Sequence, residues 1–148
     1  MSPDPSSIRS ALTNLKPIAD SLDEETENVN RLIGEVEESL ATYAMGLEVS
    51  VRVSERVVEC GGVPAVEMEN LAYARHNSEW GLWVTRIVYR NPGLETEEML
   101  ENATPVRLSA AARDRRLAAF ERITDLLEKL KSDSTHKVEA IRGALRGK

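Results

Sequence analysis

Few residues in this sequence have the chemistry of catalysis or metal binding. The chain holds two histidines, His76 and His136, far apart and without a second histidine at ligand spacing, and a single cysteine, Cys60. Zinc and iron–sulfur sites need several imidazoles or thiolates at short, recognisable spacings. The sequence therefore predicts no bound metal and no cofactor.

One small polar group could still act in acid–base chemistry. Arg75, His76 and Glu79 surround a predicted turn and could form an acid–base trio. Polar residues at a turn are more often there for solvation, and no Gly-x-Ser-x-Gly or phosphate-loop pattern occurs. Cys60 stands beside Gly61-Gly62 without an obvious base, which is typical of a structural thiol. We expect a protein that is not an enzyme.

The one basic cluster is Arg113-Asp114-Arg115-Arg116. Acidic neighbours and a pI of about 5.1 make nucleic acid an unexpected partner. Arg116 falls within an apolar helical stripe, where a guanidinium needs a partner. Arg113 and Arg116 are therefore a structural clamp or, alternatively, an anion-binding pair. The expected clamp partners are Glu35, Glu37, Glu38 and Ser39.

Length and composition limit the class of protein. A chain of 148 residues, with 41% hydrophobic and 30% charged residues, suits a single domain with its own core. The lone cysteine favours a reducing compartment. No apolar run approaches the roughly 20 residues of a membrane-spanning helix, and MSPDPSSIRS lacks the pattern of a signal peptide. We expect a cytoplasmic protein with no membrane partner.

The strongest periodic signal lies in the N-terminal third. Apolar positions alternate in steps of four and three, which is typical of a coiled-coil helix. This predicts an acidic helical arm over 7–44, with a break or kink near Pro17 and an end before Gly46. The seam residues are Ile8, Leu12, Leu15, Ala19, Leu22, Thr26, Val29, Ile33, Val36, Leu40 and Tyr43.

Between 47 and 90 the period changes to two, which predicts strands. Two-residue turns at Gly61-Gly62 and Asn77-Ser78 would join three of them in an antiparallel meander. A polar connector over about 91–104 then leads to a basic helical arm over 105–146.

The two turns predict which side chains share a face of the sheet. Val57 would lie opposite Val66, Arg56 opposite Glu67, Met68 opposite Ile87 and Ala72 opposite Trp83. Trp83 would then be core, with Val49, Val51 and Val57 on its face. The opposite face would be a contact surface with a charged rim, formed by Leu71, Tyr73, Arg75, Trp80, Leu82 and Val84. Alternatively, the chain's own helices cover that face.

Charge is distributed unevenly, with nine acidic and three basic residues in 1–45 but six acidic and eleven basic in 107–148. We therefore expect the two terminal helices to pair as an antiparallel coiled coil. The predicted fold class is α+β: a long N-terminal helix, a three-stranded antiparallel β-meander and a long C-terminal helix. This outline resembles prefoldin-type chaperone subunits in topology alone, and no motif carries the likeness.

A small sheet with an apolar face and thin helical arms is expected to form a homodimer or larger oligomer. The sequence favours a non-catalytic protein-interaction or assembly module, such as an adaptor, a chaperone-like subunit or an immunity or antitoxin-type binder of another protein. The alternative is a sensor that binds a small anionic or nucleotide ligand through arginines.

Overall fold

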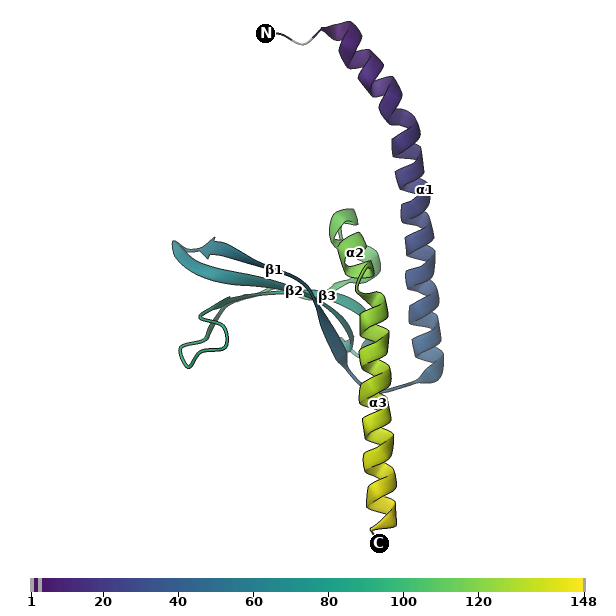
Figure 1. Ribbon diagram of the computed structural model, residues 1–148, viewed down its shortest axis with the longest axis vertical. Helices are drawn as coiled ribbons and strands as arrows, with labels where there is room; N and C mark the ends of the chain where they lie inside the picture. The colour runs from purple at the N-terminus through teal and green to yellow at the C-terminus, as the bar shows by residue number, and fades with distance from the viewer. Residues whose placement is uncertain (1, 3, 148) are drawn as a thin grey trace.

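The computed structural model describes residue 2 and residues 4–147, and its fold is α+β as predicted (Figure 1). A long helix is followed by an antiparallel sheet and a second helical region. The elements are α1 (Pro5–Tyr43), β1 (Val49–Cys60), β2 (Val63–His76), β3 (Glu79–Arg90), β4 (Glu98–Asn102), β5 (Val106–Arg107), the 3₁₀ turn η1 (Leu108–Ala110), α2 (Arg113–Phe120) and α3 (Ile123–Arg146).

Local sequence sets both ends of α1. The Asp4 carboxylate accepts a hydrogen bond from the backbone N–H of Ser6 at 3.2 Å, which caps the first turn. Ala44, in the left-handed conformation at φ 49°, ends the helix. α1 continues through Pro17, so the helix is not broken there. A proline removes only one helical hydrogen bond, and the turns on both sides remain in place.

Both predicted turns are confirmed, and so is the register they set between β2 and β3 and over Ser54–Cys60 of β1. Gly61, Gly62, Asn77 and Ser78 all have positive φ, which matches the twist of a two-residue hairpin. The predicted Cα partners are found: Val57 with Val66, Arg56 with Glu67, Met68 with Ile87, and Ala72 with Trp83.

A bulge in β1 corrects the predicted faces. The register of β1 against β2 shifts between Arg52 and Ser54, so Val53 is an extra residue. Val51 therefore pairs with Leu71, and not with Ala72 as unbroken pairing from the Gly61-Gly62 turn would require, while Val49 pairs with Tyr73. Because side chains alternate along a strand, one extra residue moves Val49 and Val51 to the other face.

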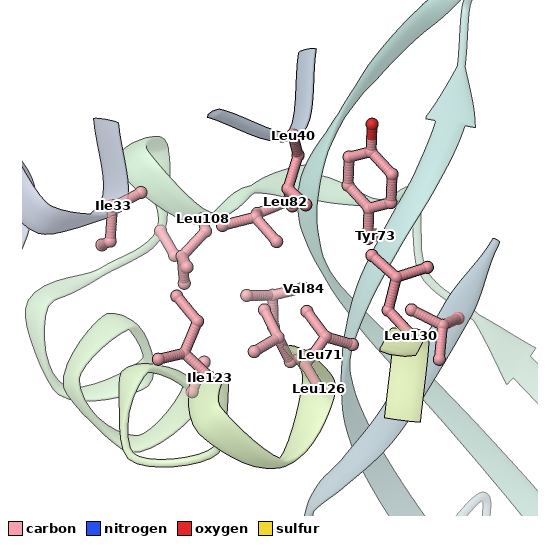
Figure 2. Packing of buried hydrophobic residues seen from close by; sticks show 13 residues of the cluster. Ile33, Leu40, Leu71, Tyr73, Leu82, Val84, Leu108, Ile123, Leu126 and Leu130 are labelled. Atoms are coloured by element: carbon pink, nitrogen blue, oxygen red, sulfur yellow. The ribbon is translucent and has the colours of Figure 1, made fainter. Parts of the chain in front are cut away.

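We call the face that carries Leu71, Tyr73, Leu82 and Val84 the inner face, because α1 and α3 pack on it. Figure 2 shows these side chains meeting Ile33 and Leu40 from α1, Leu108 from η1, and Ile123, Leu126 and Leu130 from α3. Leu71, Leu82, Leu108 and Leu126 are fully buried. This aliphatic core joins the sheet to all three helices.

The opposite, outer face has a much smaller core. Trp83 is buried there with Ala72 and Ala74, so its predicted burial is confirmed, although it lies outside the main core. The Trp83 indole N–H donates to the Ala74 carbonyl at 3.1 Å. Arg107 lies over the ring with its guanidinium carbon 5.0 Å from the centroid, and His76 meets it edge-on.

The predicted helical arm over 105–146 is interrupted. Its first residues form β5 and η1, and residues 121–122 separate α2 from α3. The predicted connector also holds β4, which pairs with β3 through residues such as Glu101 and Asn102. These short pieces have too few residues for a visible period, which is why the sequence pattern did not reveal them.

The structure does not show the predicted antiparallel coiled coil between the terminal helices. α1 and α3 run in the same direction, because β4, β5 and α2 return the chain to the middle of α1 before α3 begins (Figure 1). α2 lies beside the part of α1 near Asp23 and Asn30. α3 then follows α1 towards Tyr43 and extends past the end of that helix.

Candidate interaction surfaces

The N-terminal half of α1 stands clear of the rest of the molecule as far as Asp23, which pairs with Arg113 of α2 (Figure 1). Every residue of 5–25, which we call the N-arm, is exposed. The apolar seam changes abruptly at the end of the N-arm: Leu15 is 54% exposed, whereas Ile33 on the same seam is 0% exposed. Most of the stability of a helix in a protein comes from the packing of its apolar face, so this exposed stripe has the character of an unfilled contact surface.

Four of the six predicted contact residues are core. Leu71, Tyr73, Leu82 and Val84 are buried beneath the helices of the same chain. These four residues therefore do not form the predicted contact surface. The chain's own helices cover this face, which is the alternative that the sequence left open. The large aliphatic side chains of this face attract helices that are themselves apolar on one side.

Trp80 and Arg75 remain exposed at the edge of the inner face. They are Cα partners across β2 and β3, as the register predicts. The Trp80 ring packs against Tyr73 at 5.3 Å between centroids. With Leu40 and Gly46 the two rings border a recess of about 230 Å³ at the end of α1. Burial, and secondarily the nearby Glu37 carboxylate, raises the pKa of Tyr73.

A second apolar surface lies on the outer face, away from the helices. Val57, 81% exposed, and Met99, 50% exposed, are its most open members. We call this group the outer patch: Val57, Val66, Met68, Ile87, Tyr89 and Met99. In Figure 1 the β1–β2 hairpin projects away from the helices.

The part of the sheet that carries the outer patch has charged side chains on its inner face. Glu67 is buried and accepts hydrogen bonds from Arg56 at 2.8 Å and from Arg86 at 2.7 Å. Arg86 also pairs with Glu101 at 3.1 Å, so the ladder runs from β1 to β4. The hydrogen bond from Arg56, followed by that from Arg86, lowers the pKa of Glu67 in spite of its burial. Glu69, the Cα partner of Arg86, pairs with Arg115 of α2 at 3.0 Å.

The basic cluster holds α2 against α1. Arg113 pairs with Asp23 at 2.8 Å, and the half-buried Arg116 donates to the Asn30 side chain at 2.6 Å and to the Ala111 carbonyl. The predicted partners of Arg116 (Glu35, Glu37, Glu38 and Ser39) are therefore wrong, because α2 meets α1 about one and a half to two and a half turns earlier, at Asn30. With these partners engaged, the pair has the geometry of a clamp.

Sequence reasoning missed the contact between Arg107 and Glu37. Their side chains pair at 3.2 Å, and the same Glu37 oxygen accepts from the Leu82 backbone N–H at 3.2 Å. A Cβ at Gly81 would lie 1.4 Å from the Arg107 guanidinium, so the absent side chain makes room for it. Glycine inside a β-strand is the signal that could have indicated a close approach.

α3 contributes a third open surface. An apolar groove of about 420 Å³ runs between the end of α1 and the middle of α3, lined by residues including Tyr43, Leu130 and Val138. Further along α3, Ile141 and Leu145 are exposed. We call residues 131–146 the C-arm.

Among the described residues, no group of three or more His, Cys, Asp or Glu side chains could hold a metal ion. No helix in the described part of the chain is long and apolar enough to cross a membrane. His76 packs its ring on Trp83.

The chain matches no family model, no curated protein and no solved structure.

Proposed function

We propose that this chain is a non-catalytic assembly module that acts as a homo-oligomer through its helical seam and binds another protein through the outer patch. The observation that supports self-assembly most strongly is the difference in exposure between the two halves of α1. The apolar seam is exposed throughout the N-arm, whereas further along it Thr26, Ile33 and Leu40 are buried. A seam of this type is stable when a second helix covers it.

The outer patch supports a second contact of a different kind. It is apolar and built on an antiparallel sheet, whereas the inner face behind it is crossed by the Glu67 ladder. Exposed apolar groups of this kind mark protein contacts. The alternative function, a sensor of small anions, has less support. It would use arginines such as Arg86 and Arg113, and both already pair with carboxylates of the same chain.

Light scattering at several protein concentrations tests the proposal. We expect a mass of at least twice the 16.4 kDa of one chain. Val57→Lys should leave both that mass and the unfolding midpoint unchanged, because the side chain is 81% exposed. A protein retained on the wild-type chain should be lost from Val57→Lys and kept by the matched exposed-site control Ile141→Lys. A monomer at every concentration would contradict self-assembly.

A further inference from the structure

We infer that two copies of this chain pair through their N-arms, antiparallel and two-fold symmetric about Leu15. The inference rests on the proposed function and names the partner of the exposed seam as the N-arm of a second copy. It is carried by the spacing of the apolar residues, by the position of the arm's two ends and by the order of its charges.

The apolar stripe of the N-arm reads the same in both directions. Its large exposed side chains are Ile8, Leu12, Leu15, Ile18 and Leu22. Two antiparallel helices centred on Leu15 place residue i level with residue 30 − i, so Ile8 meets Leu22 and Leu12 meets Ile18. The small residues Ala11 and Ala19 meet one another by the same rule. Each large side chain therefore finds a large apolar partner, as a self-complementary interface requires.

The ends of the arm fit the same arrangement. α1 starts at Pro5, which comes level with Glu25 of the second copy. Glu25 is the last exposed residue before the buried Thr26, where the helix joins its own core. The two arms thus overlap along their whole length while the two sheets lie at opposite ends. Pro17 is about 200° around the helix from Leu15, at 3.6 residues per turn, so it faces away from the partner.

The order of charges favours antiparallel over parallel pairing. Residues 5–19 carry two basic and no acidic side chains, whereas residues 20–25 carry four acidic ones. Antiparallel pairing brings Arg9 level with Ser21 of the second copy, inside this acidic turn. Parallel pairing would set each acidic turn beside its own copy, and like charges at that spacing repel. Lys16, near the two-fold axis, pairs with Asp20 of its own helix at 3.3 Å.

The C-arm fits the N-arm less well. Its first large apolar residue, Val138, lies eight positions after the buried Leu130 that precedes the arm, where a continuous seam takes seven. The C-arm also carries four basic residues and only two acidic ones. Pairing with the N-arm would bring these basic residues near Arg9 and Lys16 for part of its length, and like charges repel. The steps of four, three, three and four between the large apolar residues of the N-arm match themselves when the order is reversed.

Mass measurements on two matched variants test which arm pairs. Leu15→Glu and Ile141→Glu each place a carboxylate on an exposed apolar site, 54% and 51% exposed respectively. We expect Leu15→Glu to lose the dimer at concentrations where the wild type and Ile141→Glu keep it. The near-ultraviolet circular dichroism of all three should agree, because none of these sites touches the core.

Cysteine cross-linking in a Cys60→Ser background tests direction and register. Leu15→Cys should form a disulfide-linked dimer by itself. Ile8→Cys alone should not, because the two copies of residue 8 would lie about 21 Å apart, at 1.5 Å per residue over 14 residues. A mixture of Ile8→Cys with Leu22→Cys should cross-link. Efficient self-cross-linking of Ile8→Cys would instead show parallel arms and overturn the inference.

Each other outcome is also decisive. A dimer that survives Leu15→Glu, or that cross-links Leu15→Cys to Ile141→Cys, would overturn the pairing of N-arms and leave the proposed self-assembly standing. A wild-type chain that is monomeric throughout would overturn both.

Discussion

The inner and outer faces of β2 and β3 are made by alternate residues of the same two strands, yet they are covered in different ways. Near the helices, the inner face carries Leu71, Leu82 and Val84, which lie under α1 and α3. The outer face at the same level carries Ala72, Ala74 and Trp83, which the chain covers with single side chains such as that of Arg107.

The size of the side chains explains this difference. Two alanines and one indole leave a small apolar surface that one guanidinium and one imidazole can close. Branched aliphatic chains project further and expose more apolar area, and only a helix with its own apolar side removes that area from water. The position of the helices therefore follows from the bulk of the side chains on each face.

Shortening a core residue of the inner face should have the largest effect. Leu82 is 0% exposed, so Leu82→Ala should lower the free energy of unfolding by about 2–5 kcal/mol through lost burial and a cavity. Val57→Ala on the outer patch is the control and should change it by less than about 0.5 kcal/mol. Urea unfolding followed by circular dichroism measures both. Similar losses for the two variants would contradict the assigned faces.

Glu67 tests the charged half of the inner face. Glu67→Gln keeps the shape but removes the charge that Arg56 and Arg86 contact, which should cost about 1–3 kcal/mol near pH 7. Because folding lowers the pKa of Glu67 from its ordinary value of 4.5, the unfolded chain binds this proton more readily. The carboxylate's contribution is therefore complete well above pH 4.5 and is lost as the pH falls through the lowered folded value.

The measurement is urea unfolding at pH 7 and at about pH 3.5. The difference between the wild type and Glu67→Gln should shrink at the lower pH, since the wild-type carboxyl group then begins to take up a proton. Glu98→Gln is the control, because Glu98 also pairs with an arginine but its side chain is 52% exposed. If Glu67→Gln lowers the free energy of unfolding by the same amount at both pH values, then lost shape or packing, and not lost charge, is the cause.

Much of the sheet could be predicted because its signals are local. Gly61-Gly62 and Asn77-Ser78 fix two tight turns, and two-residue turns set the register of the strands they join. The face that would be buried could not be predicted, because the bulge at Val53 has no distinctive residue and reverses every side chain before it. A valine fits a bulge and a regular strand equally well by type.

The candidate surfaces show a similar limit. The seam of α1 is continuous in sequence, so periodicity identified it, but the point where the chain stops covering it depends on where α2 meets α1. That meeting point is set by β4, β5 and η1, whose lengths of two to five residues are too short to show a period. The contact between Arg107 and Glu37 likewise joins residues 70 positions apart through those short elements.

Gly81 tests how the outer face is closed. Gly81→Ala places a methyl group where the Arg107 guanidinium lies, so the arginine must leave Trp83 or Glu37. Because Arg107 is flexible and partly exposed, we expect a loss of about 1 kcal/mol in the free energy of unfolding. In an Arg107→Ala background the same substitution should cost much less, since the obstacle is gone. Equal costs in the two backgrounds, measured as a double-mutant cycle, would show that Gly81 is required for its backbone and that Arg107 is not what closes this face.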